Sequence, residues 1–130
     1  MPSPKSQISL EFLFAIGVVL FIFIFILIFT IQKKAEVSFA TNYLEAKTDC
    51  IKLSNLINSV YVNQDSNVTF KLKNNATISP GLIEVNKDSQ ITAFCTFSVS
   101  VSNGSHNNFQ VRLGNVTLRN SNNSVIVTNV

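Results

Sequence analysis

Residues 7–31 read QISLEFLFAIGVVLFIFIFILIFTI, and this segment sets the architecture of the chain. From Phe12 to Ile31 it is polar only at Thr30. A helix of about 20 residues spans roughly 30 Å, the thickness of a bilayer hydrocarbon core. Because the segment is apolar all round, a soluble chain of 130 residues could hardly bury it. We therefore expect this helix to occupy a membrane at some stage.

Glu11 is the unusual residue of this segment, because it is a carboxylate at the edge of an apolar run. Ionisable groups at such positions are costly, and their presence indicates a function with a specific partner. A simpler reading also stays open. A glutamate in the first turn of a helix is favoured by the helix dipole by about 0.3–1 kcal/mol, and both readings can hold together.

Three kinds of membrane segment compete. A cleaved secretory signal has an apolar region of about 7–15 residues with a small-residue cleavage site close behind it. Here the apolar run is longer, Gln32-Lys33-Lys34 follows it, and the small residues of Ser38-Phe39-Ala40 lie far beyond it. A retained one-span anchor is the second reading. The third places processing before the apolar run.

The start of the chain favours processing before the run. Residues 1–6 form a short leader, and we expect Pro2 and Pro4 to keep it out of the helix. The segment that follows resembles archaeal type IV pilins with a class III signal peptide, through Lys5, Gln7, Ser9, Glu11 and the apolar run behind them.

The resemblance implies a maturation step and an assembly role. A prepilin peptidase would cut between Ser6 and Gln7, although such families more often carry Gly or Ala before the cut. Glu11 would become the fifth residue of the mature chain. The new α-amino group of Gln7, with a reference pKa of about 7.7–8.0, would be largely protonated and could meet Glu11 of a neighbouring subunit. Ser9 is a favoured residue type for capping the helix start.

The partners implied are further copies of the chain in a helical filament, other pilins, the prepilin peptidase and the pilus assembly machinery. The membrane holds the precursor before assembly. Adhesion is the role that the family suggests.

A second helical pattern follows the apolar run. Apolar residues recur at steps of three and four, at Ala46, Cys50, Leu53, Ile57 and Val60. We expect one helix from about Ser9 to about Val60. The chain then divides into a leader (1–6), a membrane and filament-core helix (7–32), an amphipathic continuation (33–62) and a β-rich head (63–130).

The head shows alternating apolar residues typical of strands. Alternation is clear over 68–72, 91–101 and 109–113, and a last strand is expected over 124–128. Pro80-Gly81 has the order of a type II turn, Gly114-Asn115 reads as a hairpin turn, and residues 121–123 read as a turn. The predicted fold is α+β and type IV pilin-like, with a single antiparallel sheet of about five or six strands packed on the helix.

The two cysteines fall on the apolar stripe of the helix (Cys50) and on the apolar face of a strand (Cys95). A disulfide between them would close a loop of about 45 residues and stabilise the fold by about 4 kcal/mol in the chain-entropy model. Two buried free thiols are the alternative.

Signals for membrane orientation disagree. Lys33 and Lys34 after the span outnumber Lys5 before it, which favours a cytoplasmic head. Disulfides and N-glycosylation sequons favour an external head. We give more weight to the sequons, which begin at Asn67, Asn75, Asn103, Asn115 and Asn122. We expect a membrane precursor and then an extracellular surface filament.

Catalytic signals are weak. The net charge of +3 is too scattered to indicate nucleic-acid binding. His106 lies in a polar loop, and Glu45 and Asp49 read as a solvated helix face. We expect no enzyme activity, cofactor or metal. The predicted function is a pilin, with a minor pilin or pseudopilin, or a non-polymerising bitopic protein with an external binding head, as alternatives.

Overall fold

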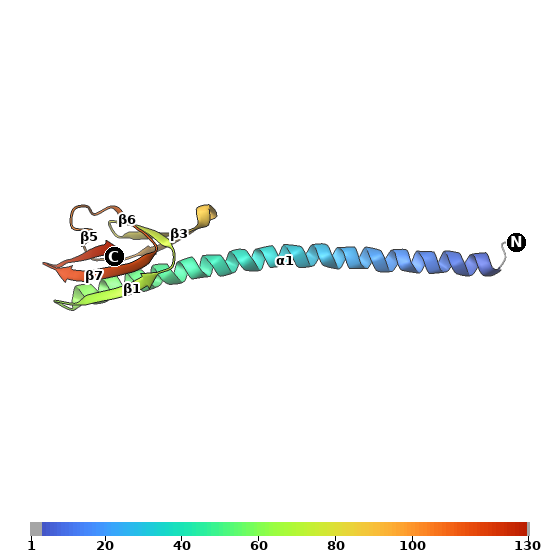
Figure 1. The fold of residues 1–130 in the computed structure, drawn as a ribbon, viewed down its shortest axis with the longest axis horizontal. Helices are drawn as coiled ribbons and strands as arrows, with labels where there is room; N and C mark the ends of the chain where they lie inside the picture. The colour runs from blue at the N-terminus through green and yellow to red at the C-terminus, as the bar shows by residue number, and fades with distance from the viewer. Residues whose placement is uncertain (1–3, 130) are drawn as a thin grey trace. The chain divides into compact units, whose positions relative to one another are not determined.

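The computed structural model describes residues 4–129, with side chains from Ser9 onward except at residue 89. One long N-terminal helix is followed by eight strands in the described part of the chain, which confirms the predicted α+β class. Figure 1 shows the helix and the strands. The chain divides into two compact units, residues 1–39 and residues 40–130. Among the described residues, those of the first unit are all helical, and the second unit contains the rest of the helix and the strands.

Helix α1 covers Pro4–Val62, so it starts earlier than the sequence predicts. Proline is tolerated in the first turn of a helix, because its missing N–H would have no intrahelical partner there and its fixed φ suits the helix. Pro4 therefore begins the helix instead of keeping the leader out of it. The predicted capping role of Ser9 is wrong for the uncut chain, since this residue lies inside α1.

The second half of α1 buries the predicted apolar stripe. The exposed fraction is 0% or 1% at each of Ala46, Cys50, Leu53, Ile57 and Val60. The helix ends against a strand, where Nδ2 of Asn120 donates hydrogen bonds to the carbonyls of Val60 (3.0 Å) and Tyr61 (2.9 Å). This amide therefore pairs carbonyls of the last turn that have no partner within the helix.

The strands form two four-stranded sheets. Sheet A has the order β1-β7-β8-β5, and sheet B has the order β4-β3-β2-β6. The strands are β1 (Asn67–Leu72), β2 (Asn75–Ser79), β3 (Leu82–Lys87), β4 (Ile91–Thr96), β5 (Val101–Ser102), β6 (Phe109–Val111), β7 (Gly114–Ser121) and β8 (Ser124–Asn129). A short 3₁₀ helix, η1 (Asp88–Gln90), links β3 to β4.

The prediction of one antiparallel sheet is therefore wrong. Two sheets are present, and β5 pairs parallel to β8. The alternation over 91–101 suggested one long strand. Instead, β4 ends at Thr96 and the chain then crosses from sheet B to sheet A. At the crossing the N–H of Phe97 bonds the carbonyl of Gly81 (3.2 Å), and the N–H of Val125 bonds the carbonyl of Ser100 (2.9 Å).

The predicted hairpin turn at Gly114-Asn115 is also wrong. Gly114 begins β7 opposite Leu72, and β6 and β7 belong to different sheets. Side-chain amides hold the backbone where it crosses. Asn129 pairs with both the N–H (3.2 Å) and the carbonyl (2.8 Å) of Arg112, and Oδ1 of Asn75 accepts the N–H of Leu113 at 2.9 Å.

Two predicted turns are confirmed. Pro80-Gly81 joins β2 to β3, and Gly81 has the positive φ (77°) that a type II turn requires at its third position. Asn122 and Asn123 join β7 to β8 with φ of 48° and 60°, as in a type I′ hairpin turn.

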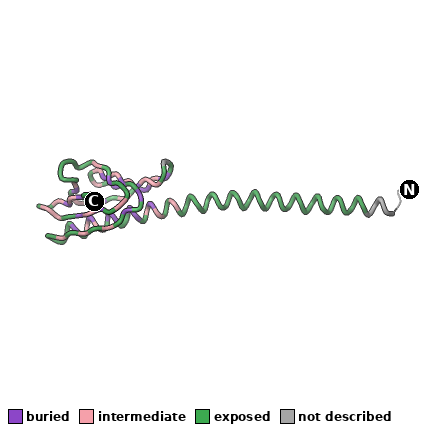
Figure 2. Tube along the Cα trace, in the orientation of Figure 1, coloured by how far each residue is buried: buried purple, intermediate pink, exposed green. Residues whose placement is uncertain are grey.

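The core of the second unit lies where the helix stripe meets the inward faces of both sheets. Figure 2 shows buried segments among the strands and along the part of α1 that belongs to this unit. Leu53 and Ile57 of α1 share one cluster with Leu118 of sheet A and with Ile78 and Ile83 of sheet B. This unit therefore has a hydrophobic core of its own.

Candidate functional site

The first candidate site is the apolar segment of α1 in the first unit. Every described side chain from Ser9 to Thr41 is exposed, as Figure 2 shows for the trace of this segment. The helix is long and apolar enough to cross a membrane by length and composition, and none of its most apolar 18-residue window, with a mean hydropathy of 3.4, is buried. Large exposed apolar surfaces mark sites of protein or membrane interaction.

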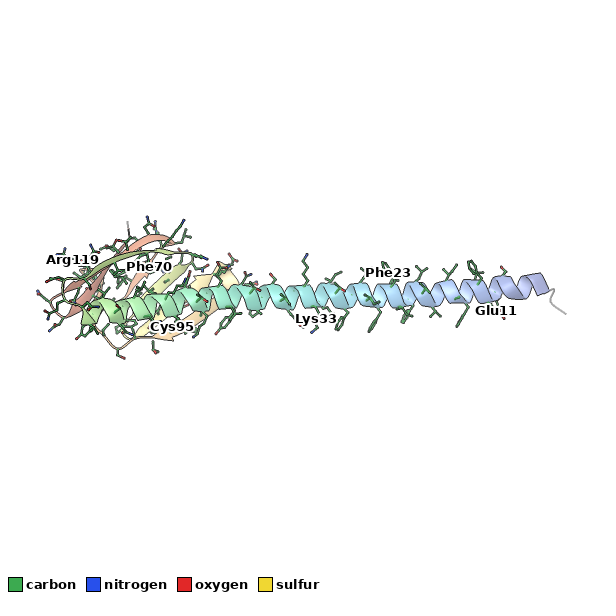
Figure 3. The ribbon with its side chains drawn as sticks, turned by 90° about the horizontal axis from the view of Figure 1, so that it is seen from below. Glu11, Phe23, Lys33, Phe70, Cys95 and Arg119 are labelled. Atoms are coloured by element: carbon green, nitrogen blue, oxygen red, sulfur yellow. A yellow bond between two sulfur atoms is a disulfide. The ribbon has the colours of Figure 1, made fainter. Side chains whose placement is uncertain are left out.

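This surface extends around the whole helix. In Figure 3 the side chains stand out on opposite sides of the ribbon, with Phe23 and Glu11 among those labelled. Six of the 11 Phe residues lie between Phe12 and Phe29. Thr30, the polar residue near the end of the run, donates its hydroxyl to the carbonyl of Ile26 at 2.8 Å. That bond satisfies the hydroxyl within the helix.

Glu11 is exposed near the start of this surface. The first turn of α1 contains no acidic residue, and Glu11 lies beyond it. Because the dipole effect falls off within the first turn, the dipole does not account for Glu11 in the uncut chain. Among the described residues, no hydrogen bond or ion pair to its carboxylate is formed.

The predicted cleavage site lies near the first of the described residues. Residues 1–3 of the expected leader are outside the described residues, and so are the side chains of Ser6 and Gln7. The backbone on both sides of the Ser6–Gln7 bond belongs to α1.

The far end of the apolar run carries a basic residue with two local contacts. Nζ of Lys33 lies 2.9 Å from Oε2 of Glu36 and 5.6 Å from the centre of the Phe29 ring. Lysine side chains at the end of an apolar helix place their stem along apolar surface and their charge toward water.

In the second unit, a disulfide joins Cys50 and Cys95, as the sequence predicts. Their Cα atoms are 5.9 Å apart. Cys50 is buried on the helix stripe, and Cys95 is half-buried on β4. Two neighbours of Cys50 along α1, Lys47 and Ser54, donate hydrogen bonds to the carbonyls of Phe94 and Thr96. Helix side chains thus pair backbone groups along β4, an edge strand of sheet B.

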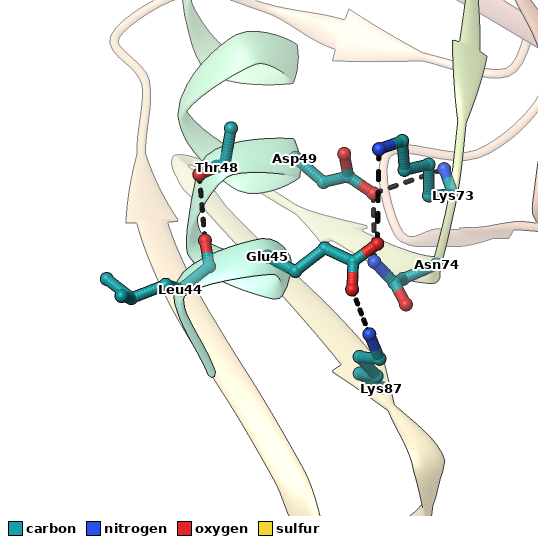
Figure 4. Close-up of polar contacts among 7 residues, drawn as sticks. All are labelled: Leu44, Glu45, Thr48, Asp49, Lys73, Asn74 and Lys87. Carbon is teal, nitrogen blue, oxygen red and sulfur yellow. Dashed lines mark hydrogen bonds and ion pairs between the residues drawn. The ribbon is translucent and has the colours of Figure 1, made fainter. Parts of the chain in front are cut away.

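Glu45 and Asp49 are not the solvated face that the sequence suggested. Figure 4 shows both carboxylates facing the loop between β1 and β2. Asp49 is buried, and its Oδ2 accepts the N–H of Lys73 (3.1 Å) and Nδ2 of Asn74 (2.9 Å). The sequence carried no local signal for these contacts, because the partners lie 24 and 25 residues away.

Glu45 pairs with two lysines, one from the β1–β2 loop (Lys73) and one from β3 (Lys87). Its Oε2 bonds Nζ of Lys87, and its Oε1 lies 4.0 Å from Nζ of Lys73. The hydrogen bond from Lys87 and the charge of Lys87 lower the pKa of Glu45, and the charge of Lys73 adds to this effect. The pair of carboxylates therefore anchors α1 to the β-rich part of the unit and has a structural role.

All five sequon asparagines, Asn67, Asn75, Asn103, Asn115 and Asn122, are exposed. They differ in local structure. Asn67, Asn75 and Asn115 lie in strands. Asn103 lies in the loop between β5 and β6, and Asn122 lies in the β7–β8 turn.

Residues suited to catalysis are sparse. His106 is exposed, and its backbone N–H donates to Oδ1 of Asn103 at 2.9 Å. Within residues 4–129, no group of three or more His, Cys, Asp or Glu is arranged to hold a metal ion. The surface hollows of the second unit are open and lined mainly by polar side chains, as in the one bordered by Asn75, Asn86 and Arg112.

Comparison of the chain with protein-family models, curated proteins and solved structures finds no match. We therefore base the function on the residues themselves.

Proposed function

We propose that this chain is a structural subunit of an archaeal type IV pilus-like surface filament. A prepilin peptidase matures it by cutting between Ser6 and Gln7, and it polymerises through its N-terminal helix. The observation that carries the proposal is the carboxylate of Glu11 at the edge of the first part of α1, where residues 12–31 are apolar on all sides and every described side chain is exposed.

The exposed helix supports burial in an assembly of like helices. Burying apolar surface stabilises by about 25 cal/mol per Å² removed from water. For a helix that starts in lipid, this gain is already made, so packing and polar pairing decide whether helices associate. Glu11 supplies a polar group for such pairing. The resemblance to class III signal peptides supplies its partner, the new amino group of Gln7 on a neighbouring subunit.

The pairing of Glu11 with an amine would also set the register of the filament. Apolar helices slide past one another at little cost, whereas a buried ion pair has one favoured position. Removing one partner of a buried pair costs about 3–5 kcal/mol, because it leaves an unpaired charge in a low dielectric. A subunit without this carboxylate would therefore insert and mature but assemble poorly.

The second unit supports display outside the cell. It has its own core, a disulfide and five exposed sequon asparagines. Disulfides persist in oxidising compartments. A helix with an amphipathic second half packed on a β-rich head is consistent with a type IV pilin-like layout, and adhesion is the role we assign to the filament.

A retained, non-polymerising anchor is the second candidate, because a bilayer alone would also cover the exposed helix. A minor pilin or pseudopilin is a variant of the first proposal.

The yield of surface filaments distinguishes a polymerising subunit from a retained anchor, and Glu11→Ala is the direct variant. We expect normal processing with at least a tenfold loss of sheared surface filaments. Glu36→Ala, which removes an exposed carboxylate from the same helix, serves as the matched control. Abundant filaments from Glu11→Ala would remove the assembly role of this residue.

A further inference from the structure

Two of the five sequons face each other across one strand pair. The Asn67-Val68-Thr69 sequon lies on β1, and the Asn115-Val116-Thr117 sequon lies on β7. These strands pair antiparallel with Thr69 directly opposite Thr117. The two hydroxyl oxygens are 3.0 Å apart and form a hydrogen bond. The third residues of both sequons are therefore bonded to each other.

This contact engages the hydroxyl groups of Thr69 and Thr117, the third residues that make Asn67 and Asn115 acceptors. In asparagine glycosylation, Nδ2 forms a bond to the anomeric carbon of a glycan carried on a lipid phosphate. The bond from that carbon to the phosphate oxygen breaks, the lipid phosphate leaves, and an amide proton passes to solvent. The acceptor motif requires Ser or Thr at its third position and is typical of surface loops, which indicates that strand pairing of these residues hinders transfer.

The third strand sequon is held in a similar way. Asn75 begins β2, which pairs with β3 on one side and β6 on the other. Its Oδ1 accepts the N–H of Leu113 at 2.9 Å, and Thr77 lies opposite both Glu84 and Gln110. Access to this acceptor requires the opening of a central strand.

The two turn sequons differ. Asn122 is the first residue of the β7–β8 turn, and Asn103 begins the loop from β5 to β6. Ser124, the third residue of the Asn122 sequon, begins β8, and its hydroxyl donates only a long hydrogen bond (3.5 Å) to the carbonyl of Ser100. Oδ1 of Asn103 accepts the N–H groups of Ser105 (3.0 Å) and His106 (2.9 Å). These bonds stay within one loop, and neither Asn103 nor Asn122 belongs to a strand.

We propose that Asn67, Asn75 and Asn115 accept glycans only before the strands pair, whereas Asn103 and Asn122 remain acceptors in the folded unit. The folded unit can nevertheless carry the early glycans. Asn67 and Asn115 are exposed on the outer face of sheet A. Asn67 lies opposite Arg119 and Asn115 opposite Lys71, so the two are about 13 Å apart along the strands at about 3.3 Å per residue.

The test compares folded and unfolded full-length chains with every sequon intact. Leu53→Asp places a charge at a position that is 0% exposed in the core and should unfold the second unit. Ile51→Asp is the matched control, because this side chain is 47% exposed on the same helix and the unit should stay folded. Each chain, in detergent, is incubated with an oligosaccharyltransferase and a lipid-linked oligosaccharide. Peptide mass spectrometry then gives the occupancy of each site over time.

We expect the natural chain and Ile51→Asp to be modified at Asn103 and Asn122. Transfer at the three strand sites should be at least about tenfold slower in them than in Leu53→Asp, because it must await opening of the unit. A synthetic peptide of residues 64–72 gives the rate at Asn67 without strand pairing, whatever the fold of the variant. Equal rates of glycan transfer at Asn67 in the folded chain and in the peptide would contradict the proposal. So would a folded chain that accepts nothing at Asn103 and Asn122. Neither outcome bears on filament assembly, which this inference does not require.

Discussion

At the residue scale, the proposed cleavage would change the surroundings of the Glu11 carboxylate. In the uncut chain α1 begins at Pro4, so Glu11 lies beyond the first turn. A cut before Gln7 would move the start of the helix to within four residues of the carboxylate. The dipole of the shortened helix and the amine of a neighbour would then both favour the charged form. The two readings of Glu11 from the sequence thus become compatible only after maturation.

Asp49 gives a prediction at this scale. Asp49→Ala should lower the free energy of unfolding of the second unit by about 1–3 kcal/mol, because Asn74, itself 7% exposed, loses the acceptor for its amide. Urea unfolding of the full chain in detergent measures this. Glu36→Ala, in the other unit, should change the same transition little. Equal midpoints for Asp49→Ala and the natural chain would show that the buried contact contributes nothing.

Asn120 gives a second prediction at the residue scale. Its amide bonds the carbonyls of Val60 and Tyr61 at the end of α1. Asn120→Ala should destabilise the second unit by about 0.5–1.5 kcal/mol, since the carbonyl of Tyr61 loses its hydrogen bond whereas that of Val60 keeps the hydroxyl of Ser66. Asn107→Ala, in the exposed loop before β6, is the matched control. Hydrogen exchange should show faster opening of the last turn of α1 in Asn120→Ala, and unchanged exchange there would contradict the capping role.

The sequence could not predict these residues for a common reason. Asp49 and Asn120 act on backbone or amide groups 24 or more residues away, and no local spacing reports such a contact. Glu45 and Asp49 are four residues apart in the sequence, which is also the spacing of an ordinary surface pair on a helix. Only the position of the β1–β2 loop distinguishes the two cases.

At the element scale, periodicity predicted the helix stripe and the disulfide. Cys50 and Cys95 each follow the apolar period of their element, so both point into the same core. Periodicity failed where the chain changes sheets. The crossings at residues 97–100 and 112–113 depend on single hydrogen bonds from distant residues, including the amides of Asn75 and Asn129. An alternating pattern continues through such a crossing and hides it.

The disulfide gives a prediction for the helix and β4 together. Reducing the Cys50–Cys95 bond should lower the free energy of unfolding by about 4 kcal/mol, because the unfolded chain regains the entropy of the closed loop. Urea titrations with and without reductant measure the difference. The double variant Cys50→Ala/Cys95→Ala should give the lower value in both conditions. If the urea midpoint of the natural chain is the same with and without reductant, the disulfide does not contribute this stability.

The contact of Glu45 with Lys87 gives a pH prediction. Lys87 lowers the pKa of the folded carboxyl below its ordinary value of about 4.5. Its contribution to stability is therefore present above that ordinary value and is lost as the pH falls through the lowered pKa of the folded state. The stability difference between the natural chain and Glu45→Gln should be visible at pH 7 and should shrink below about pH 4.5. Glu36→Gln is the control, and a difference that grows with acid would contradict the sign.

At the scale of the whole molecule, the two units divide the physical tasks. Residues 4–39 of the first unit form a helix, and every described side chain there is exposed, so these residues have no core of their own. Residues 40–130 contain the core, the disulfide and the sequons. The first unit therefore needs a covering of lipid or like helices, whereas the second is stable through its own contacts. Composition indicated an apolar N-terminal helix followed by a more polar, β-rich part, because the apolar residues are concentrated before Gln32.

The most direct test of the proposed function is the N-terminal sequence of the protein in filaments sheared from the cell surface. Electron microscopy of the same sample shows whether filaments are present. We predict filaments whose subunit begins at Gln7, with Glu11 as its fifth residue. A surface protein that begins at Met1 or Pro2 would contradict the account. So would a sample in which this chain is present but filaments are absent. Either result would favour a retained membrane anchor.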